Sequence, residues 1–376
     1  MTHDSRAQHG ISQSNGIETI MSGRGGAGAS LARAGLGVLE IGYRLAIWSR
    51  NGLYDAGVLR SHTLGRATIS IGNLTTGGTG KTPLVAMLAV ELSHRGQHPA
   101  VLMRGYHKTR GGQSDEAMLL ESAGILVETS PNRRASAARV LAREPLVDVF
   151  LLDDGLQHRR VRRDMEVVVI DATEPFGFGH LLPRGMLREP PAALSRAHAI
   201  VLTRTGRISG DARDQLINRV KALSPHSPVY CCDHVIERIT ASGVSRQVSD
   251  LAGKPYVMAC GIGNPAGFVA AMQTAAAGPP AATRFFPDHH DYTDADVTAL
   301  TELAASCKSA AIVVTAKDWV KLRTLPSIMQ RAGRVEFCVA ELDLRFSGGD
   351  RNALIDQTLA AIRPAGANAG LSDGAT

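Results

Sequence analysis

The sequence predicts an α/β fold in which a parallel sheet is covered by helices on both faces. Short segments whose apolar residues form continuous rather than alternating runs are separated by helical segments; they cover residues 68–71, 99–105, 147–155, 166–173 and 198–204. A strand that is apolar at every position is buried on both faces, which is typical of parallel sheets. Ligands of such sheets bind at the carboxyl ends of the strands, so the residues there are the first candidates for a site.

The N-terminal residues are expected to lie outside this sheet. Residues 1–30 are polar and then rich in glycine, alanine and arginine, which predicts a disordered leader. Residues 31–54 predict an apolar helix, because Arg33, Glu40 and Arg44 fall on one narrow stripe. Tyr43 and Trp48 are available as interfacial anchors. Either the protein's own core, the commoner case, or the headgroup boundary of a membrane could cover such a helix.

A glycine-rich turn joins the first strand to a helix, and residues 72–83 read GNLTTGGTGKTP. This arrangement suits a polyphosphate, because glycines let backbone N–H groups approach anionic oxygens beside a positive helix N-terminus. Lys81 would reach the β- and γ-phosphates, and Thr82 would hold Mg²⁺. The other residues expected around the phosphates are Thr75, Gly77, Gly78, Thr79 and Gly80. The strict P-loop pattern has glycine where this chain has Thr75, so the alternative is a glycine-rich turn with a chance Gly-Lys-Thr.

An acidic pair, Asp153 and Asp154, ends the apolar strand at 147–155. A strand that presents a carboxylate beside a P-loop can hold or orient Mg²⁺. The alternative is ordinary turn chemistry. Gln157 and His158 follow, and an acid, an amide and an imidazole in one loop favour a ligand site.

A second acidic residue, Asp115, lies in a polar loop that follows the strand at 99–105. A carboxylate there could accept the proton of an attacking hydroxyl, as kinases require. The alternative is a helix N-terminal pair, Asp115 and Glu116, favoured by the helix dipole.

A smaller α/β unit is expected after a boundary near residue 225, with strands at 255–262, 310–319 and 335–342. Within it, His289 and His290 lie between Asp288 and Asp291. Adjacent side chains do not chelate a metal easily, so a hydrogen-bonded His–Asp pair is the preferred interpretation and a solvated loop is the alternative. The polar residues around residues 315–321 are expected either to make contacts across an interdomain cleft or to form a charged loop.

Residues 177–190 form a long loop that reads GFGHLLPRGMLREP. Loops of this length inside compact domains are usually functional. Arg184 and Arg188 could bind a second anionic group, because guanidinium groups suit phosphates.

Composition limits the class of protein. The 376 residues suffice for about two domains, and 44% hydrophobic with 20% charged residues describe an ordinary globular chain. The net charge of +6 and pI ≈ 9.2 fit an anionic partner without choosing among nucleotide, nucleic acid and acidic lipid. The cysteines show no CxxC spacing, which favours a reducing cytoplasm, and neither a signal peptide nor a membrane-spanning apolar run is evident.

Taken together, these stretches resemble the tetraacyldisaccharide 4′-kinase family, the lipid A 4′-kinases of Gram-negative bacteria. The resemblance covers about residues 36–345 in one order: the apolar helix, GNLTTGGTGKTP, RGY, SDE, DDGLQHRR, GHLLPRGMLREP, AHAIVLTR, CGIGNP, FPDHHDYT and TAKD. Thr75 agrees with the family's own loop. Family members usually have alanine at the position of Arg184 and glycine at that of Ser114.

The resemblance implies a two-domain P-loop kinase that moves the γ-phosphate of ATP to the 4′-hydroxyl of tetraacyldisaccharide 1-phosphate. Carried over, Asp115 is the proposed base, His289 orients it, and Lys81 contacts the phosphates. Residues implied to hold Mg²⁺ are Thr82, Asp153 and Asp154, and those implied to meet the substrate are Gln157, His158, Arg184 and Arg188.

The resulting partition is a leader at 1–30, a membrane-associating helix at 31–60, a P-loop kinase domain at 61–225, a smaller closing domain at 226–363 and a flexible tail at 364–376. The protein is expected at the cytoplasmic face of the inner membrane, as a peripheral or monotopic protein bound to its lipids. No nucleic-acid partner is expected, and the sequence does not indicate the oligomeric state. Two alternatives remain at this point: a membrane-bound nucleotide switch and a soluble metallochaperone-type NTPase.

Overall fold

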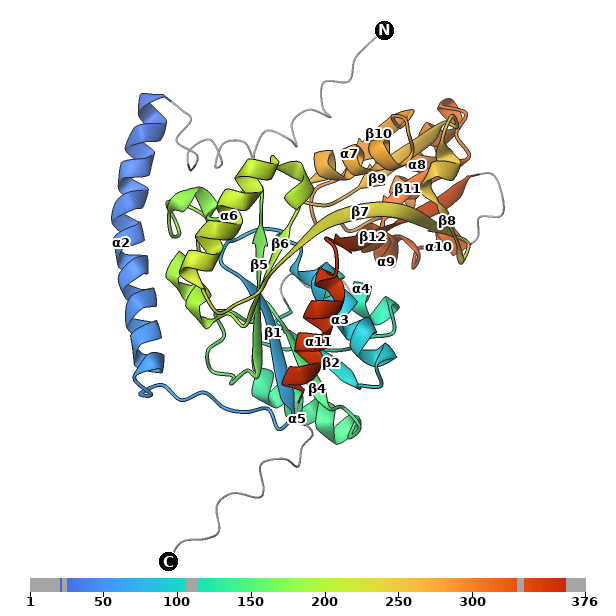
Figure 1. Ribbon diagram of the computed structural model, residues 1–376. Helices are drawn as coiled ribbons and strands as arrows, with labels where there is room; N and C mark the ends of the chain where they lie inside the picture. The colour runs from blue at the N-terminus through green and yellow to red at the C-terminus, as the bar shows by residue number, and fades with distance from the viewer. Residues whose placement is uncertain (1–20, 22–25, 106–113, 330–334, 363–376) are drawn as a thin grey trace, which may run out of the picture.

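A single large sheet runs through the molecule (Figure 1). The computed structural model describes residues 21, 26–105, 114–329 and 335–362. Within them the strands are β1 (Ala67–Asn73), β2 (Pro99–Met103), β3 (Leu126–Thr129), β4 (Val149–Asp153), β5 (Met165–Asp171), β6 (Ala199–Thr203), β7 (Val229–Ala241), β8 (Val244–Gln247), β9 (Tyr256–Cys260), β10 (Ala282–Phe285), β11 (Ala311–Thr315) and β12 (Glu336–Phe346). Their order is β10-β9-β11-β12-β7-β6-β5-β1-β4-β2-β3, with β8 on β7.

Helices cover both faces of this sheet. They are α2 (Ala27–Asp55), α3 (Lys81–His94), α4 (Asp115–Ser122), α5 (Arg133–Arg143), α6 (Gly210–Leu223), α7 (Pro265–Ala275), α8 (Asp294–Ser306), α9 (Ala316–Leu322), α10 (Pro326–Met329) and α11 (Asp350–Ala361). Short 3₁₀ turns are η1 (Gly177–Gly179), η2 (Pro191–Arg196), η3 (Thr205–Arg207) and η4 (Val248–Leu251).

The first half of the chain forms the parallel sheet that the sequence predicts. β3, β2, β4, β1, β5 and β6 pair in parallel, in that order across the sheet. One core contains the apolar side chains of α3, α4 and α11, and two further cores contain those of α5 and of α6 with η2. Apolar residues form continuous runs in these strands because both faces of the sheet lie against helices. The predicted α/β fold class, with helices on both faces, is confirmed.

β7 connects the two parts of the sheet. Its first residues pair in parallel with β6, and the rest pairs antiparallel with β12 and β8 (Figure 1). Beyond this ribbon, β12, β11, β9 and β10 pair in parallel, with α7 packed on one side and α8 and α9 on the other. The second α/β unit is therefore continuous with the first through two strands.

The structure differs from the predicted partition at both ends. α2 begins at Ala27, within the expected 1–30 leader; residues 1–20 and 22–25 lie outside the described residues, as does the tail from 363. α11 was grouped with the second unit, at 226–363. It packs instead in the core of the first half, where Leu354 is fully buried against the α3 side of the sheet. The long antiparallel β12 returns the chain to the first half, a long-range pairing that no local pattern encodes.

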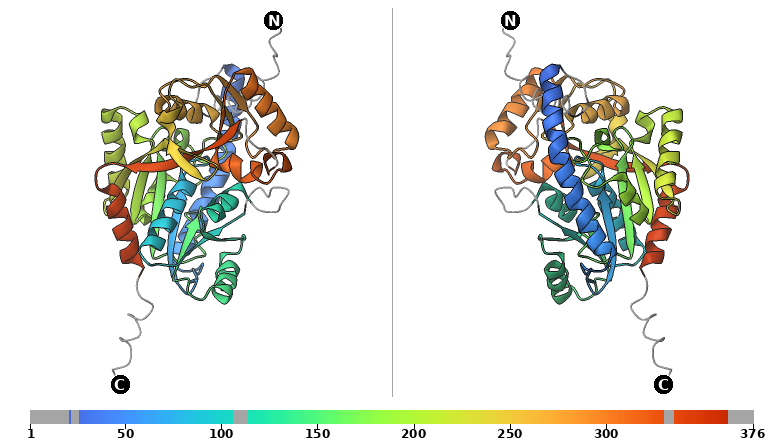
Figure 2. Two further views of the ribbon diagram at one scale, coloured as in Figure 1. Left: turned by 90° about the vertical axis from the view of Figure 1, so that its right-hand side faces the viewer. Right: turned by 90° about the vertical axis from the view of Figure 1, so that its left-hand side faces the viewer.

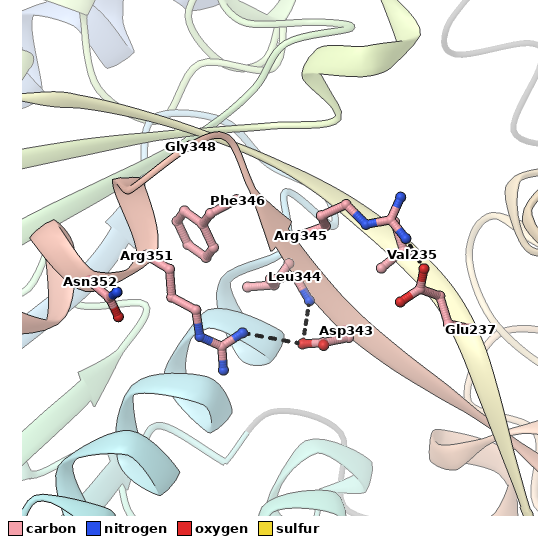
Figure 3. Close-up of a pocket in the computed structure, with 9 residues that line it drawn as sticks. All are labelled: Val235, Glu237, Asp343, Leu344, Arg345, Phe346, Gly348, Arg351 and Asn352. Carbon is pink, nitrogen blue, oxygen red and sulfur yellow. Dashed lines mark hydrogen bonds and ion pairs between the residues drawn. The ribbon is translucent and has the colours of Figure 1, made fainter. Parts of the chain in front are cut away.

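A polar pocket of about 320 Å³ lies beside the β7–β12 ribbon, at the start of α11 (Figure 3). Its arginines are paired with neighbouring acids. Arg345 pairs with Glu237, and Arg351 lies 3.8 Å from Asp343 and 2.9 Å from Glu91 of α3. None of the predicted site residues lines this pocket.

α2 lies along the outside of the first half and crosses one face of the molecule (Figure 2). Its large apolar side chains are mostly exposed to solvent, among them Leu39, Leu45 and Trp48, whereas Glu40 and Ile47 are buried. The helix thus turns its acidic residue inward and its apolar surface outward, the reverse of a core helix. Among the described residues, no helix has the length and apolar character needed to cross a bilayer.

Candidate active site

The glycine loop joins β1 to α3 as the sequence predicts. Gly80 has a φ of 94°, a left-handed conformation that favours glycine, and a Cβ at this position would collide with the His234 ring. Lys81 Nζ lies 2.9 Å from Asn73 Oδ1 and 3.5 Å from Asp154 Oδ1. The loop therefore holds its lysine at the N-terminus of α3, next to the acidic pair, where such loops bind phosphate.

The rest of the loop is fixed by side chains at the end of β6. Thr203 donates a hydrogen bond to the Thr79 carbonyl at 2.9 Å, and Arg204 donates one to the Gly78 carbonyl at 2.9 Å. Gly77 has a φ of 107°. Thr79 Oγ1 is buried and has no hydrogen-bond partner within the described residues. These contacts hold the loop by its carbonyl groups. The Thr79 N–H is occupied by the Gly77 carbonyl at 3.1 Å, so the glycine N–H groups are the ones to offer an anion.

Residues 177–190 lie against the first part of the glycine loop. Thr75 forms an isolated bridge with Leu187, the Thr76 N–H donates to the Met186 carbonyl at 2.8 Å, and the Arg188 N–H donates to the Leu74 carbonyl at 2.7 Å. This long loop is therefore part of the phosphate site's scaffold.

The acidic pair lies at the end of β4, directly beside β1. Burial raises the pKa of Asp153 to about 6, against the opposing charge of Lys81. Burial also acts on Asp154, but Lys81 and Arg188, whose Nη1 is 2.7 Å from Asp154 Oδ2, lower its pKa. Asp153 Oδ1 is buried without a hydrogen-bond partner in the described part of the chain. Carboxylate and hydroxyl oxygens suit Mg²⁺, so Asp153, Asp154 and Thr82 in the first turn of α3 fit that cation.

Gln157 and His158 follow the pair but contact the protein. Gln157 Nε2 donates to the Arg188 carbonyl at 3.1 Å, which also accepts from Tyr43 of α2 at 3.1 Å. Burial lowers the pKa of His158 to about 4, and the nearby Arg133 charge adds to the effect. His158 is therefore a neutral imidazole at physiological pH.

Asp115 is the first residue of α4 and is completely buried. Ser114 caps the helix by accepting the Ala117 N–H at 3.3 Å. Asp115 Oδ2 lies 3.1 Å from His289 Nδ1 and 2.8 Å from Lys321 Nζ. The structure thus brings together two predicted residues from opposite halves of the chain.

The two histidines of the loop have different surroundings: His289 contacts Asp115, whereas His290 packs within the second unit. His289 has a φ of 62°, and its Nε2 lies 3.5 Å from Lys317 Nζ. His290 stacks on Phe286 at 4.7 Å and lies 3.2 Å from Asp296 in the cap of α8. Within the described residues, no three histidine, cysteine or acidic side chains form a metal-binding group.

Arg184 lies against α2 rather than beside the phosphate loop. Glu40 of α2 accepts the Leu181 N–H at 3.1 Å and lies 3.3 Å from His180 and 3.9 Å from Arg184. One helical turn after Glu40, the Tyr43 hydroxyl donates to the Arg188 carbonyl. Two turns further on, Arg50 pairs with the buried Glu189. The polar stripe of α2 is thus bound to the same loop that scaffolds the phosphate site.

Some residues of the site were missed by sequence reasoning. Asn73 contacts Lys81 from the last position of β1, and Arg133 donates to the Asp153 carbonyl at 3.3 Å. Asn73 lies inside the glycine-loop motif, so its place in the site could have been predicted from the sequence. Arg133 begins a separate helix, and nothing in its neighbours points to the acidic pair.

The fold and this site define a P-loop α/β protein, the class in which a glycine loop, its lysine and a strand-end carboxylate bind a nucleoside triphosphate. The sequence model described as Tetraacyldisaccharide-1-P 4′-kinase matches residues 32–362. The chain belongs to this family.

Relatives support the assignment along most of the chain. The tetraacyldisaccharide 4′-kinase of Anaeromyxobacter dehalogenans (strain 2CP-C) is 36% identical over 345 residues, which cover 85% of this chain and 89% of the relative. That of Geobacter metallireducens is 36% identical over 339 residues, 84% of this chain and 95% of the relative. The crystal structure of "apo" form LpxK from Aquifex aeolicus in complex with ATP has a TM-score of 0.68 at 24% identity, covering 88% of this chain and 100% of that one. That structure shares the fold.

Proposed function

We propose that this protein transfers the γ-phosphate of ATP to the 4′-hydroxyl of tetraacyldisaccharide 1-phosphate, a step of lipid A biosynthesis. Family membership supports the kinase over a nucleotide switch or a metallochaperone-type NTPase. The observation that carries the proposal is the pairing of Asp115 with His289 at 3.1 Å. A switch needs a P-loop and its carboxylates, but it has no use for a buried acid paired with an imidazole.

Asp115 begins its helix next to the acidic pair of the phosphate site. The charge of its neighbour Glu116 contributes to the raised pKa of Asp153, so the first turn of α4 and the end of β4 are close in space. A hydroxyl that reaches Asp115 would therefore lie near the terminal phosphate of a nucleotide held by Lys81, which is the geometry that phosphoryl transfer requires.

The chain's own residues account for the steps of the reaction. Backbone N–H groups of the loop glycines (Gly77, Gly78 and Gly80) and the Lys81 ammonium bind the phosphates and stabilise the negative charge that spreads over the transferred group. Asp115 accepts the hydroxyl proton, and His289 orients the carboxylate. Thr82, Asp153 and Asp154 would hold Mg²⁺, which would neutralise phosphate charge when bound.

The remaining roles are assigned by the same reasoning. Arg188 and Arg184 lie on the loop between α2 and the phosphate site, and we assign them to the substrate with Gln157 and His158. The part of the chain after β7, which supplies His289, would close over the acceptor. The exposed apolar face of α2 would rest in the headgroup boundary of the cytoplasmic face of the inner membrane, where a tetraacylated lipid remains.

The direct test is a product assay. The purified chain is mixed with Mg-ATP and tetraacyldisaccharide 1-phosphate in detergent, and the lipid is analysed by mass. The proposal expects a lipid that has gained one phosphate and an equal amount of ADP. ADP formed at the same rate without the lipid, and no phosphorylated lipid, would favour the NTPase alternatives.

A further inference from the structure

A buried lysine reaches the proposed base from the other half of the chain. Lys321 Nζ lies 2.8 Å from Asp115 Oδ2, although the two residues are 206 positions apart. The Lys321 side chain is 7% exposed and that of Asp115 is 0% exposed. Lysine is rarely buried to this degree, and a buried ion pair contributes little net stability once desolvation is counted. Stability alone is therefore a weak reason for this pair.

The two oxygens of Asp115 have different surroundings. Oδ2 is in contact with both Lys321 Nζ and His289 Nδ1, whereas Oδ1 is buried and has no hydrogen-bond partner among the described residues. A buried acceptor without a partner is costly, and such atoms deserve an explanation in terms of a ligand or catalysis. With Oδ2 occupied, Oδ1 is the oxygen left to receive a proton from a hydroxyl.

α9 is held firmly in the position from which Lys321 reaches Asp115. The fully buried Asp318, one turn earlier, accepts hydrogen bonds from the Gly261 N–H at 3.0 Å, the Tyr292 hydroxyl at 2.9 Å and the Thr315 hydroxyl at 2.5 Å. The Tyr292 ring also lies 5.6 Å from Lys321 Nζ. The ammonium is thus placed by a rigid scaffold.

Other charged groups lie on the elements that pack around the start of α4. From α9, Lys317 contacts Glu116 at 3.2 Å; the histidine loop adds His289 and Asp288. β3, which packs on α4, carries Glu128, and this carboxylate is paired with Arg139 at 2.7 Å. Of these groups, Lys321 is the fixed cation in direct contact with the Asp115 carboxylate.

We propose that Lys321 is a positioning residue for the phosphoryl transfer: it holds Asp115 by Oδ2 and so turns Oδ1, which has no partner among the described residues, toward the acceptor hydroxyl. This inference rests on the proposed kinase function. A charge removed from beside a buried carboxylate favours the protonated acid, which cannot accept a proton.

The test compares Lys321→Met with Lys254→Met, which removes a lysine from an exposed position of the second unit. We expect Lys321→Met to lower kcat about 100-fold or more. ATP binding should be unchanged, because Lys321 lies outside the phosphate loop. The acidic limb of its kcat profile should move about 1 pH unit or more upward, and Lys321→Arg should keep the limb in place. Wild-type kcat and pH profile in Lys321→Met would overturn the inference.

A second comparison serves if Lys321→Met does not fold. In an Asp115→Asn background the carboxylate charge is absent, so adding Lys321→Met should leave the residual kcat unchanged within about twofold. A further loss of about 100-fold would show an independent role and refute the inference. Failure of the proposed function is distinguished by the unmutated protein, which would then form no phosphorylated lipid.

Discussion

The outward face of α2 offers a prediction that can be worked from exposed surface. Leu39, Leu45 and Trp48 are 61%, 58% and 74% exposed, and the triple replacement by serine removes these three apolar side chains and leaves Val38 and Ile41 in place. Full burial of one such side chain is worth about 1.5–3 kcal/mol. Scaled by exposure, the three together would lose about 3–6 kcal/mol of binding to a lipid surface, or about 100- to 10,000-fold in partitioning.

The measurement is sedimentation with anionic phospholipid vesicles over a range of lipid concentration. Because the three side chains are already in solvent, the free energy of unfolding should change by less than about 1 kcal/mol. The matched control replaces Leu146, Met329 and Leu342, which are also exposed but lie on the body of the protein, and it should bind vesicles as the unmutated chain does. Equal binding by both triple variants would refute the assignment of α2 to the membrane.

The other predictions concern the two clusters of the site. Asp115→Asn should bind ATP normally and lose turnover by about 100-fold or more; near-normal turnover would remove Asp115 from the role of base. His289→Ala should lower kcat and remove one limb of the pH–rate profile, and an unaltered profile would leave His289 a structural role. Burial lowers the pKa of His234 to about 4 from 6.5, so its neutral form stabilises the fold above pH 6.5 and that stability is lost as pH falls toward 4. His234→Gln should therefore flatten the fall of unfolding free energy by about 1 kcal/mol per pH unit in this window, and parallel curves for the two proteins would contradict the burial argument. Gly80→Ala should weaken ATP binding, since alanine is strained at this φ and meets the His234 ring; calorimetry that gives equal affinity would show that the loop adapts.

Local chemistry explains which parts of the site could be predicted. The glycine loop and the acidic pair were found because strand, turn and helix signals lie within a few residues of Lys81 and Asp153. The order of the strands, in contrast, depends on contacts between distant segments. The parallel pairing of β1 with β4 brings these two motifs together. The sequence predicted that both strands belong to a parallel sheet, but it did not predict that they are neighbours.

The contact between Asp115 and His289 was expected from family resemblance, and the structure contains it. The local sequence pattern alone left a non-catalytic interpretation open for each residue, because an acid at a helix start and a histidine in a solvated loop are common. Lys321 is itself one of the polar residues at 315–321 that were expected either to make contacts across an interdomain cleft or to form a charged loop, and its side chain contacts Asp115 of the first half. The sequence could not predict that the acidic partner of Lys321 is Asp115, because the two residues are 206 positions apart in the chain.

For α2, the sequence identified the stripe but not the side that would face the protein. The sequence places Glu40 on a polar stripe with Arg33 and Arg44. Of the two surfaces that could cover the apolar remainder of the helix, the protein's own core is the commoner. The structure shows the opposite, because residues 180–184 supply a buried Glu40 with an N–H group and basic neighbours. Burial would raise the pKa of Glu40, but the hydrogen bonds from Arg44 and Leu181 outweigh it and lower the pKa.

The position of residues 177–190 between α2 and the glycine loop has a geometric consequence. One side of this segment is bound by Glu40, Tyr43 and Arg50, and the other pairs with residues 74–76. The helix and the nucleotide are thereby kept at a constant separation. If α2 lies flat on a bilayer, as proposed, the protein would set the height above the acyl chains at which the phosphoryl group is delivered. Lipids with shorter or longer acyl chains would then present their sugar at the same height and be phosphorylated at similar rates.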